Sequence, residues 1–461
     1  MAAKKTKVDP AKTLAAHVID TGIKEVPEAS LDATRRDVLD TFGSMLGGSG
    51  APGINELVSV NGRWGGLEES SLAVIGGKMP AHHAAMINSA MGHALDFDDT
   101  YDKGGHVHPG TSVLAASLAI AESVGGVSGE QLMLAATLGL DVSCRLGLAA
   151  HDDRGWHRTA SFGIFGATAA AGKLIGLNQE QMVHAFGIAY SQAAGNRQCI
   201  VDGALTKRFQ AGQAAHGAVL SAFLAKEGFT GAENVFAGRY GFFPMYQPDG
   251  YDLSIIDKDL GKEFLGDRIS FKPYPCVRPS HAFIDAAVKL HHELELGKNE
   301  IESIIVRMDP ETLDSRYNLS VGIARPSHQV EAQFSVRYLI GCALALGGVG
   351  IDEINVFTNP EVLAASELVT AESRQGVAKG WAEIEVVCVG GKTASAELES
   401  PFGSPDNPLS IDQLKDKFRD CAAHAAHPTP KAMVEKMITM ILSPDALTDS
   451  ADLIKLSLVS K

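Results

Sequence analysis

Residues 93–109, His-Ala-Leu-Asp-Phe-Asp-Asp-Thr-Tyr-Asp-Lys-Gly-Gly-His-Val-His-Pro, gather titratable groups between two apolar segments of the chain. They hold four Asp and three His. Small apolar residues with helical spacing precede them from Ala84 onward, and a second apolar run extends from Val113 to Ala121. Acid and base groups between apolar helices are costly to bury unless they are paired or functional. The stretch is therefore the first candidate for chemistry, and the flanking runs predict a helical scaffold around it.

The composition is that of a folded protein with more than one core. The chain has 461 residues, of which 45% are hydrophobic and 21% charged, values typical of globular domains. The formal net charge of −15 argues against nucleic acid or an anionic membrane as a partner. An anionic substrate would need a local basic pocket in this acidic protein.

The cysteines and the first residues predict a cytoplasmic protein. Six cysteines are spread singly, without a CxxC pair or metal-type spacing, which indicates reduced thiols (Cys144, Cys199, Cys276, Cys342, Cys388 and Cys421). The initial lysines are followed by no apolar segment, and Asp9 comes early, so neither a secretory signal nor a transit peptide is expected. No run of 18 apolar residues predicts a membrane span.

Apolar spacing predicts helices over most of the first 265 residues, and a mixed segment after them. The helices are expected at 10–25, 31–47, 81–96, 111–125, 129–149, 160–175, 179–194 and 209–227, with a short helix, turns and an extended Leu72–Ile75 in between. Strands are expected at 301–308, 383–389 and 393–398, the last two as a hairpin around Gly390-Gly391, and helices at 280–295, 331–346, 411–424 and 429–442.

These elements predict a mainly α protein with an α+β domain. Residues 1–267 would form the first part of an all-helical domain and residues 268–402 the α+β domain. Residues 403–461 would be C-terminal helices that rejoin the helical domain.

Several interpretations of the opening stretch remain open from the residues alone. If the preceding helix continued, Asp96, Asp99 and Thr100 would share a face, and His108 beyond the turn could approach Asp96 as an acid–base pair. The alternative is a helix end with solvated carboxylates. A metal site is less favoured, because no second His pair or HExxH supports His-x-His. A phosphatase-type Asp nucleophile in Asp96-Phe-Asp-Asp-Thr100 would need a preceding buried strand, and the offsets exclude an EF-hand loop.

Three further motifs offer groups for the same chemistry. His157 comes just before the helix expected at 160–175, where the positive end of the helix dipole favours anions. Lys207 and Arg208 begin an apolar helix and suggest carboxylate binding. Arg278 and His281 follow a proline-rich loop at the expected domain junction, where pockets are common. Taken singly, each has a structural alternative, namely a loop histidine, a solvated helix start and a rigid linker.

Together these groups suit proton transfer next to a carboxylate. Such a reaction needs a base of near-neutral pKa and cations that hold the developing enediolate. GxSxG, P-loop and GxGxxG motifs in their strand-turn-helix contexts are missing from the sequence, which disfavours covalent serine chemistry, nucleotide hydrolysis and a dinucleotide cofactor.

The motifs, taken in order, resemble the MmgE/PrpD family. The resemblance covers residues 10 to about 440 and rests on the stretch at 93–100 with His108-Pro109, Gly155-Trp-His157, Thr206-Lys207-Arg208, Gly228-Phe-Thr-Gly231, Gly241-Phe-Phe243, Tyr274-Pro-Cys276 with Ser280-His281, and Gln333-Phe-Ser335. The family includes 2-methylcitrate dehydratase, cis-aconitate decarboxylase and iminodisuccinate epimerase. The resemblance implies two domains, a homodimer, and neither a metal nor an organic cofactor.

The family's active-site pattern carries over to Asp96, Thr100, His108, His157, Lys207 and His281. This implies catalytic roles for Asp96, His108, His157, Lys207 and His281, with Thr100, Lys103, Arg208 and Arg278 binding substrate. The chain departs from many relatives at Lys103-Gly-Gly and Gln210, and relatives vary at Arg278, so these positions bear on which substrate is used.

The resulting expectation is a cofactor-independent lyase, first of all a dehydratase, acting on a small di- or tricarboxylate of the methylcitrate or aconitate type. An epimerase or isomerase and a decarboxylase are alternatives that use the same pocket. A catalytically silent carboxylate-binding homologue is the non-enzyme alternative.

Overall fold

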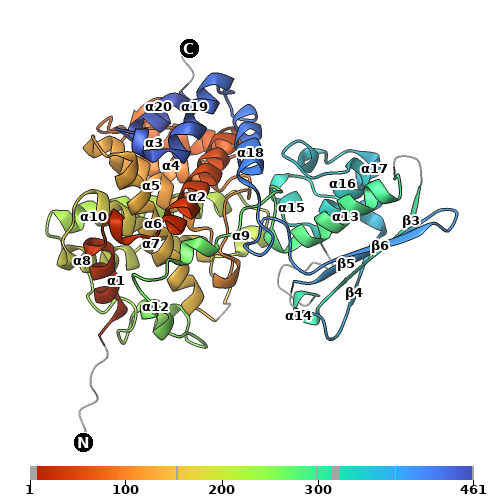
Figure 1. The fold of residues 1–461 in the computed structure, drawn as a ribbon, viewed down its shortest axis with the longest axis horizontal. Helices are drawn as coiled ribbons and strands as arrows, with labels where there is room; N and C mark the ends of the chain where they lie inside the picture. Colours follow the sequence, from red (N-terminus) through yellow and green to blue (C-terminus); the bar gives the residue numbers. More distant parts are fainter. Residues whose placement is uncertain (1–7, 152–153, 297–299, 314–321, 379, 459–461) are drawn as a thin grey trace, which may run out of the picture.

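Closely packed helices build the larger of two lobes in the computed structural model, which describes residues 8–458 apart from 152–153, 297–299, 314–321 and 379 (Figure 1). The long helices are α1 (Pro10–Asp20), α2 (Glu28–Gly47), α3 (Ile54–Trp64), α4 (Ala81–Gly92), α5 (Pro109–Val124), α6 (Gly129–Ala149), α7 (Arg158–Leu174), α8 (Gln179–Tyr190) and α10 (Thr206–Lys226). Short helices α9 (Gln198–Val201), α11 (Phe242–Tyr246) and α12 (Ser254–Asp257) lie in the connections.

Small residues let these helices approach one another. A Cβ atom on Gly139 of α6 would lie 2.8 Å from the carbonyl oxygen of Gly166 in α7, and one on Gly212 of α10 would lie 2.5 Å from that of Met86 in α4. Helix α6 is long and apolar enough to cross a membrane, but it packs against α5 and α7 and is buried over nearly its whole length. Its position is that of a core helix.

The smaller lobe is a four-stranded sheet with helices on one face. Strands β3 (Ile301–Met308), β4 (Val369–Ser373), β5 (Ala382–Cys388) and β6 (Thr393–Leu398) are arranged in the order β4-β3-β5-β6. The β3/β4 pair is parallel and the other pairs are antiparallel. Alternate residues of β3 and β5 are buried against α13 (His281–Glu293), α16 (Val336–Leu346) and α17 (Pro360–Leu368). Helices α14 (Pro310–Leu313) and α15 (Gln329–Gln333) complete this lobe.

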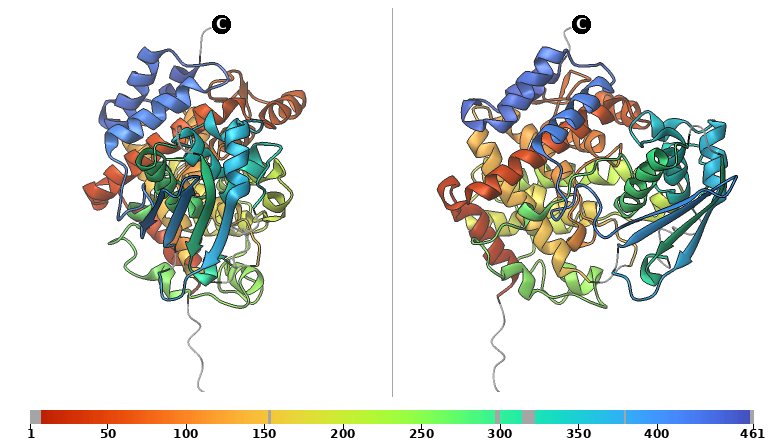
Figure 2. Two further views of the ribbon diagram at one scale, coloured as in Figure 1. Left: turned by 90° about the vertical axis from the view of Figure 1, so that its right-hand side faces the viewer. Right: turned by 45° about the vertical axis from the view of Figure 1, so that its right-hand side comes forward.

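After the sheet the chain returns to the larger lobe. Helices α18 (Ile411–Ala423), α19 (Lys431–Leu442) and α20 (Ala451–Ser457) lie on that lobe, with α18 and α19 against α2 (Figures 1 and 2). One hydrophobic core accordingly joins residues 11–269 with residues 409–454, and a second core lies within 276–396. The predicted fold class, mainly helical with a smaller α+β part, is confirmed.

Some local predictions were wrong for identifiable reasons. Residues 72–75 form the turn between the short strands β1 (Ser70–Ser71) and β2 (Lys78–Met79), because two glycines with positive φ follow and close a hairpin. The helix expected at 331–346 is interrupted where Ser335 accepts a hydrogen bond from the amide of Tyr338 and begins α16. Strand β4 was not predicted, because it follows α17 directly and shows little alternation of burial.

Candidate active site

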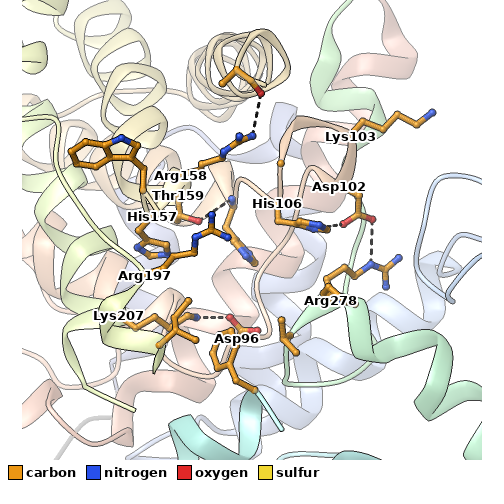
Figure 3. A pocket seen from close by; sticks show the side chains of 18 of the residues that line it. Asp96, Asp102, Lys103, His106, His157, Arg158, Thr159, Arg197, Lys207 and Arg278 are labelled. Atoms are coloured by element: carbon orange, nitrogen blue, oxygen red, sulfur yellow. Dashed lines mark hydrogen bonds and ion pairs between the residues drawn. The ribbon is translucent and has the colours of Figure 1, made fainter. Parts of the chain in front are cut away.

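A cavity of about 840 Å³ lies where the two lobes meet. Its walls come from the loop between α4 and α5, the start of α7, the α9–α10 region and residues 272–279, with Phe334 closing one side. Figure 3 shows Lys207 directed toward Asp96, and His106 and Arg278 directed toward Asp102. The cavity therefore depends on both lobes.

The loop that carries the opening stretch begins earlier than predicted. Helix α4 ends at Gly92, and Asp96 has a left-handed backbone conformation with a φ of 53°, so Asp96, Asp99 and Thr100 do not share a helical face. The backbone of Thr100 pairs with Ser270 through two hydrogen bonds of 2.8 and 2.9 Å. This pairing fixes the loop against the segment that leads into the smaller lobe.

Asp96 lies between two buried ammonium groups. Lys207 forms an ion pair with one of its carboxylate oxygens, and Lys272 donates to the other oxygen at 2.9 Å and to the backbone carbonyl at 2.8 Å. Burial raises the pKa of Asp96, but the two lysines outweigh it and hold that pKa well below its usual range. Burial also lowers the pKa of Lys207 against the attraction of Asp96. Two cations on one carboxylate leave the floor of the cavity positive.

Two buried histidines lie beside a second carboxylate, that of Asp98, and a third buried histidine lies beside one of them. His93 Nδ1 lies 2.7 Å and His108 Nδ1 lies 3.6 Å from the same oxygen of Asp98. The ring of His157 lies 5.4 Å, centroid to centroid, from that of His93. Burial lowers the pKa of all three well below the usual value, and Lys207 or Lys272 adds to the effect. The rings are therefore neutral near pH 7 and are available as bases.

The structure thus places Asp98, and not Asp96, beside His108. From the sequence we expected His108 to approach Asp96 as an acid–base pair. The difference follows from the end of α4 at Gly92 and the left-handed backbone of Asp96, because residues beyond a helix end no longer follow its spacing. His93, Asp98 and His108 have ligand atoms within 4.8 Å of one another, so together they could hold a metal ion.

Arg278, at the start of the smaller lobe, lines the cavity. Its Nε donates to Asp102 at 3.2 Å, and its Nη1 donates to the carbonyl of Phe402 at 2.8 Å and to His281 Nδ1 at 3.2 Å. The other nitrogen of His281 lies 3.2 Å from the carbonyl oxygen of Cys276. Because arginine only donates and a carbonyl only accepts, His281 is the neutral Nε2–H tautomer. His281 is fully buried and lies behind Arg278, outside the cavity lining.

Asp102 connects Arg278 to the rim of the cavity. It also lies 3.5 Å from His106 Nδ1 and accepts from Ser270 Oγ at 2.6 Å. Burial raises its pKa, but His106 and Arg278 outweigh burial and hold the pKa below its usual range. Figure 3 shows this Arg278–Asp102–His106 row at the rim, with Lys103 beside it and its ammonium group directed away from the row.

Other residues singled out from the sequence lie away from the cavity. Thr100 is buried and does not line it. Arg208 donates to the carbonyl of Pro52 at 3.0 Å and to Gln329 at 3.4 Å, and burial lowers its pKa to about 10. Gln210 binds the backbone of Asn196, accepting from its amide at 2.7 Å and donating to its carbonyl at 3.1 Å. Gln210 thus holds Asn196 in place, and the residue after Asn196, Arg197, lines the cavity.

Sequence reasoning missed several groups of the site. They are Lys272, Asp98, His93, Arg158 and Arg197. Lys272 stood within the proline-rich loop already noticed, and its position beside two prolines was an available signal. The sequence carries no signal for Arg158, the first residue of α7, or for Arg197, which directly precedes α9.

Buried carboxylates also lie behind the site. Asp99 accepts from the amide of Gly110 at 3.1 Å, and the carboxylate of Asp37 also lies beside Gly110. Burial raises the pKa of both well above the usual value, and repulsion by a neighbouring carboxylate, Asp40 for Asp37 and Asp37 for Asp99, adds to the effect. Burial raises the pKa of the nearby Asp40, which is paired with Lys417 at 2.5 Å, to about 6. Asp37 and Asp99 therefore keep a proton at pH values where an exposed aspartate has lost it.

Neutral imidazoles and buried ammonium groups around one cavity, between a helical lobe and an α+β lobe, define an acid–base site that suits an anionic ligand. The chain belongs to the MmgE/PrpD family, as its motifs predicted. The MmgE/PrpD N-terminal domain matches residues 12–253 and the MmgE/PrpD C-terminal domain matches residues 274–441.

Curated relatives are similar over almost the whole chain. The cis-aconitate decarboxylase of Aspergillus terreus is 26% identical over 458 residues, which cover 94% of this chain and 92% of that protein. The cis-aconitate decarboxylase of Mus musculus is 26% identical, with 94% and 90% covered, and that of Homo sapiens is 27% identical, with 91% and 88% covered.

Proposed function

We propose that this protein is a lyase that needs no cofactor and removes water from a small di- or tricarboxylate of the methylcitrate or aconitate type. One observation carries the proposal, namely neutral buried histidines beside two buried ammonium groups in a single cavity. Elimination of water next to a carboxylate needs a neutral base for the carbon-bound proton and a cationic acid for the leaving hydroxyl group. The site offers both, and family membership supports the assignment.

In the proposed reaction His108 accepts the proton. Its Nδ1 faces Asp98, which leaves Nε2 for the substrate. As the C–H bond breaks, the carboxylate of Asp98 stabilises the imidazolium that forms. Lys207, whose pKa is lowered by burial, protonates the leaving hydroxyl group, and the electron pair of the C–H bond becomes the new C=C bond. Lys207 then regains a proton from water and His108 releases one.

The other groups of the site bind and orient the substrate in this proposal. Arg278 and Lys272 hold its carboxylates and stabilise the enediolate that develops during proton removal. His157, at the beginning of α7, hydrogen-bonds the departing hydroxyl group. His281 acts through Arg278 by holding its guanidinium group at 3.2 Å.

A decarboxylase is the second candidate, and the names of the curated relatives favour it. In that reaction a C–C bond breaks, CO₂ leaves, and Lys207 protonates the carbanion. An epimerase would begin with the same proton abstraction and return the proton to the opposite face.

Proton NMR of the products in D₂O separates these reactions. The purified protein is incubated with methylcitrate, citrate, cis-aconitate and iminodisuccinate, and product and substrate spectra are followed. The proposal expects an alkene that forms with loss of water. Release of CO₂ with one deuteron gained would establish the decarboxylase, and deuterium exchange without a change in composition would establish the epimerase. Carboxylate-dependent thermal stabilisation without turnover of any compound would indicate a silent homologue.

A further inference from the structure

Three histidines gather outside the active site, at the far end of the helix pair α4/α10. His82 and His83 lie in the first turn of α4, and His216 lies on α10. One nitrogen from each ring lies within 4.8 Å of the other two. Ring centroids of His82 and His83 are 4.2 Å apart, and those of His82 and His216 are 4.8 Å apart. All three residues are partly buried.

The two helices run antiparallel, with the cluster at one end and the active site at the other. Ser89 Oγ of α4 donates to the carbonyl of Ala211 in α10 at 3.0 Å. One end of the pair brings Lys207 to Asp96, while the opposite end brings His216 to the start of α4. The histidines therefore lie where a cross-link would fix the two helices that position the acid–base groups.

The environment of the cluster suits a ligand set. The Nδ1 atoms of His83 and His216 are buried and have no hydrogen-bond partner within the described part of the chain. The ring of Trp64 lies 6.0 Å, centroid to centroid, from that of His83 at a tilt of 49°. Burial lowers the pKa of each histidine, that of His216 to about 4. The rings are thus neutral, which is the form that binds metal ions.

We propose that His82, His83 and His216 bind a divalent transition-metal ion of the Zn²⁺, Co²⁺, Ni²⁺ and Cu²⁺ class and thereby clamp α4 to α10. Three imidazole ligands exclude Mg²⁺ and Ca²⁺, which prefer oxygen. Zn–N bonds of about 2.0–2.1 Å require nitrogen atoms about 3.4 Å apart in a tetrahedral site. Side-chain rotation closes the present spacing, and water supplies the fourth ligand. The ion takes no part in the reaction proposed for the cavity.

Zn²⁺ binding to chelator-treated protein tests the site. Wild type, His216→Ala and a control, His427→Ala, which removes an exposed histidine elsewhere, are titrated with ZnCl₂, and bound metal and melting temperature are measured. We expect wild type and the control to bind one Zn²⁺ ion more than His216→Ala and to melt at higher temperature with zinc. Loss of a direct ligand should weaken binding by more than the roughly 10- to 100-fold that loss of a supporting hydrogen bond costs.

Comparison with His216→Ala also separates this site from His93, Asp98 and His108, since zinc bound there would remain in the variant. His83→Gln serves as a second variant if His216→Ala does not fold. Equal zinc stoichiometry and affinity in wild type and either folded variant would overturn the proposal. Co²⁺ added to wild type should give the visible absorption of a tetrahedral nitrogen site. The same absorption in the folded variant would also overturn the proposal.

Discussion

Replacement of Asp98 by Asn tests how the base is supported. The carboxylate lies 3.6 Å from His108 Nδ1, so a full imidazolium at that distance gains about 4–5 kcal/mol at an effective dielectric constant of 20. If about half the charge has developed in the transition state, the loss is about 2.3 kcal/mol, or roughly 50-fold in kcat. Because the Asp98 charge raises the pKa of His108, its removal should also shift the acidic limb of the pH profile to lower pH.

The assay is steady-state turnover of the best substrate from the carboxylate panel, measured from pH 5 to 10. Asp267→Asn is the control, because this carboxylate accepts a hydrogen bond from Ser30 at 2.8 Å and does not line the cavity. Circular dichroism establishes that both variants are folded. An Asp98→Asn enzyme with the kcat and pH profile of wild type would refute the pairing of Asp98 with the base.

Three further predictions follow from the buried charges. Lys272→Met leaves Asp96 with one cation and should cost about 3–5 kcal/mol of unfolding free energy in urea; a change below 1 kcal/mol would contradict the pairing. The acidic limb of the kcat/KM profile should lie below pH 6.5, because burial lowers the pKa of His108. The alkaline limb should lie below pH 10.5, because burial lowers the pKa of Lys207. An acidic limb above pH 6.5 or an alkaline limb above pH 10.5 would contradict these assignments. Burial raises the pKa of Asp37, so the free energy of unfolding of wild type falls as pH rises from the unfolded to the folded pKa of this group, by up to about 1.4 kcal/mol per pH unit. Asp37→Asn should lack this loss, and equal pH slopes in the two proteins would contradict the raised pKa.

Much of the fold was predictable because the helices are amphipathic or apolar in a regular way. Helix α6 begins at Gly129 and ends at Ala149, as its spacing predicted, and the alternation in β3 and β5 identified the sheet. Strand β4 was missed, because its partner β3 lies more than 60 residues earlier in the chain and its own burial barely alternates. Parallel pairing of that kind leaves no local signal.

The sequence predicted several of the chemical groups that line the cavity, but it did not predict which of these groups pair with one another. The titratable residues Asp96, His108 and Lys207 do line the cavity. Their pairing depended on where α4 ends and on the left-handed conformation of Asp96, and sequence spacing does not encode either. Lys272 reaches Asp96 from 176 residues away along the chain, a contact that only the tertiary fold determines.

The most direct test of the acid–base site compares His108→Ala and Lys207→Ala with wild type on the same panel of carboxylates. We expect wild type to convert at least one compound and each folded variant to lose roughly 100- to 10,000-fold in kcat, the usual contribution of a general acid or base. Unchanged turnover in both variants would contradict the assignment of the cavity as the catalytic site.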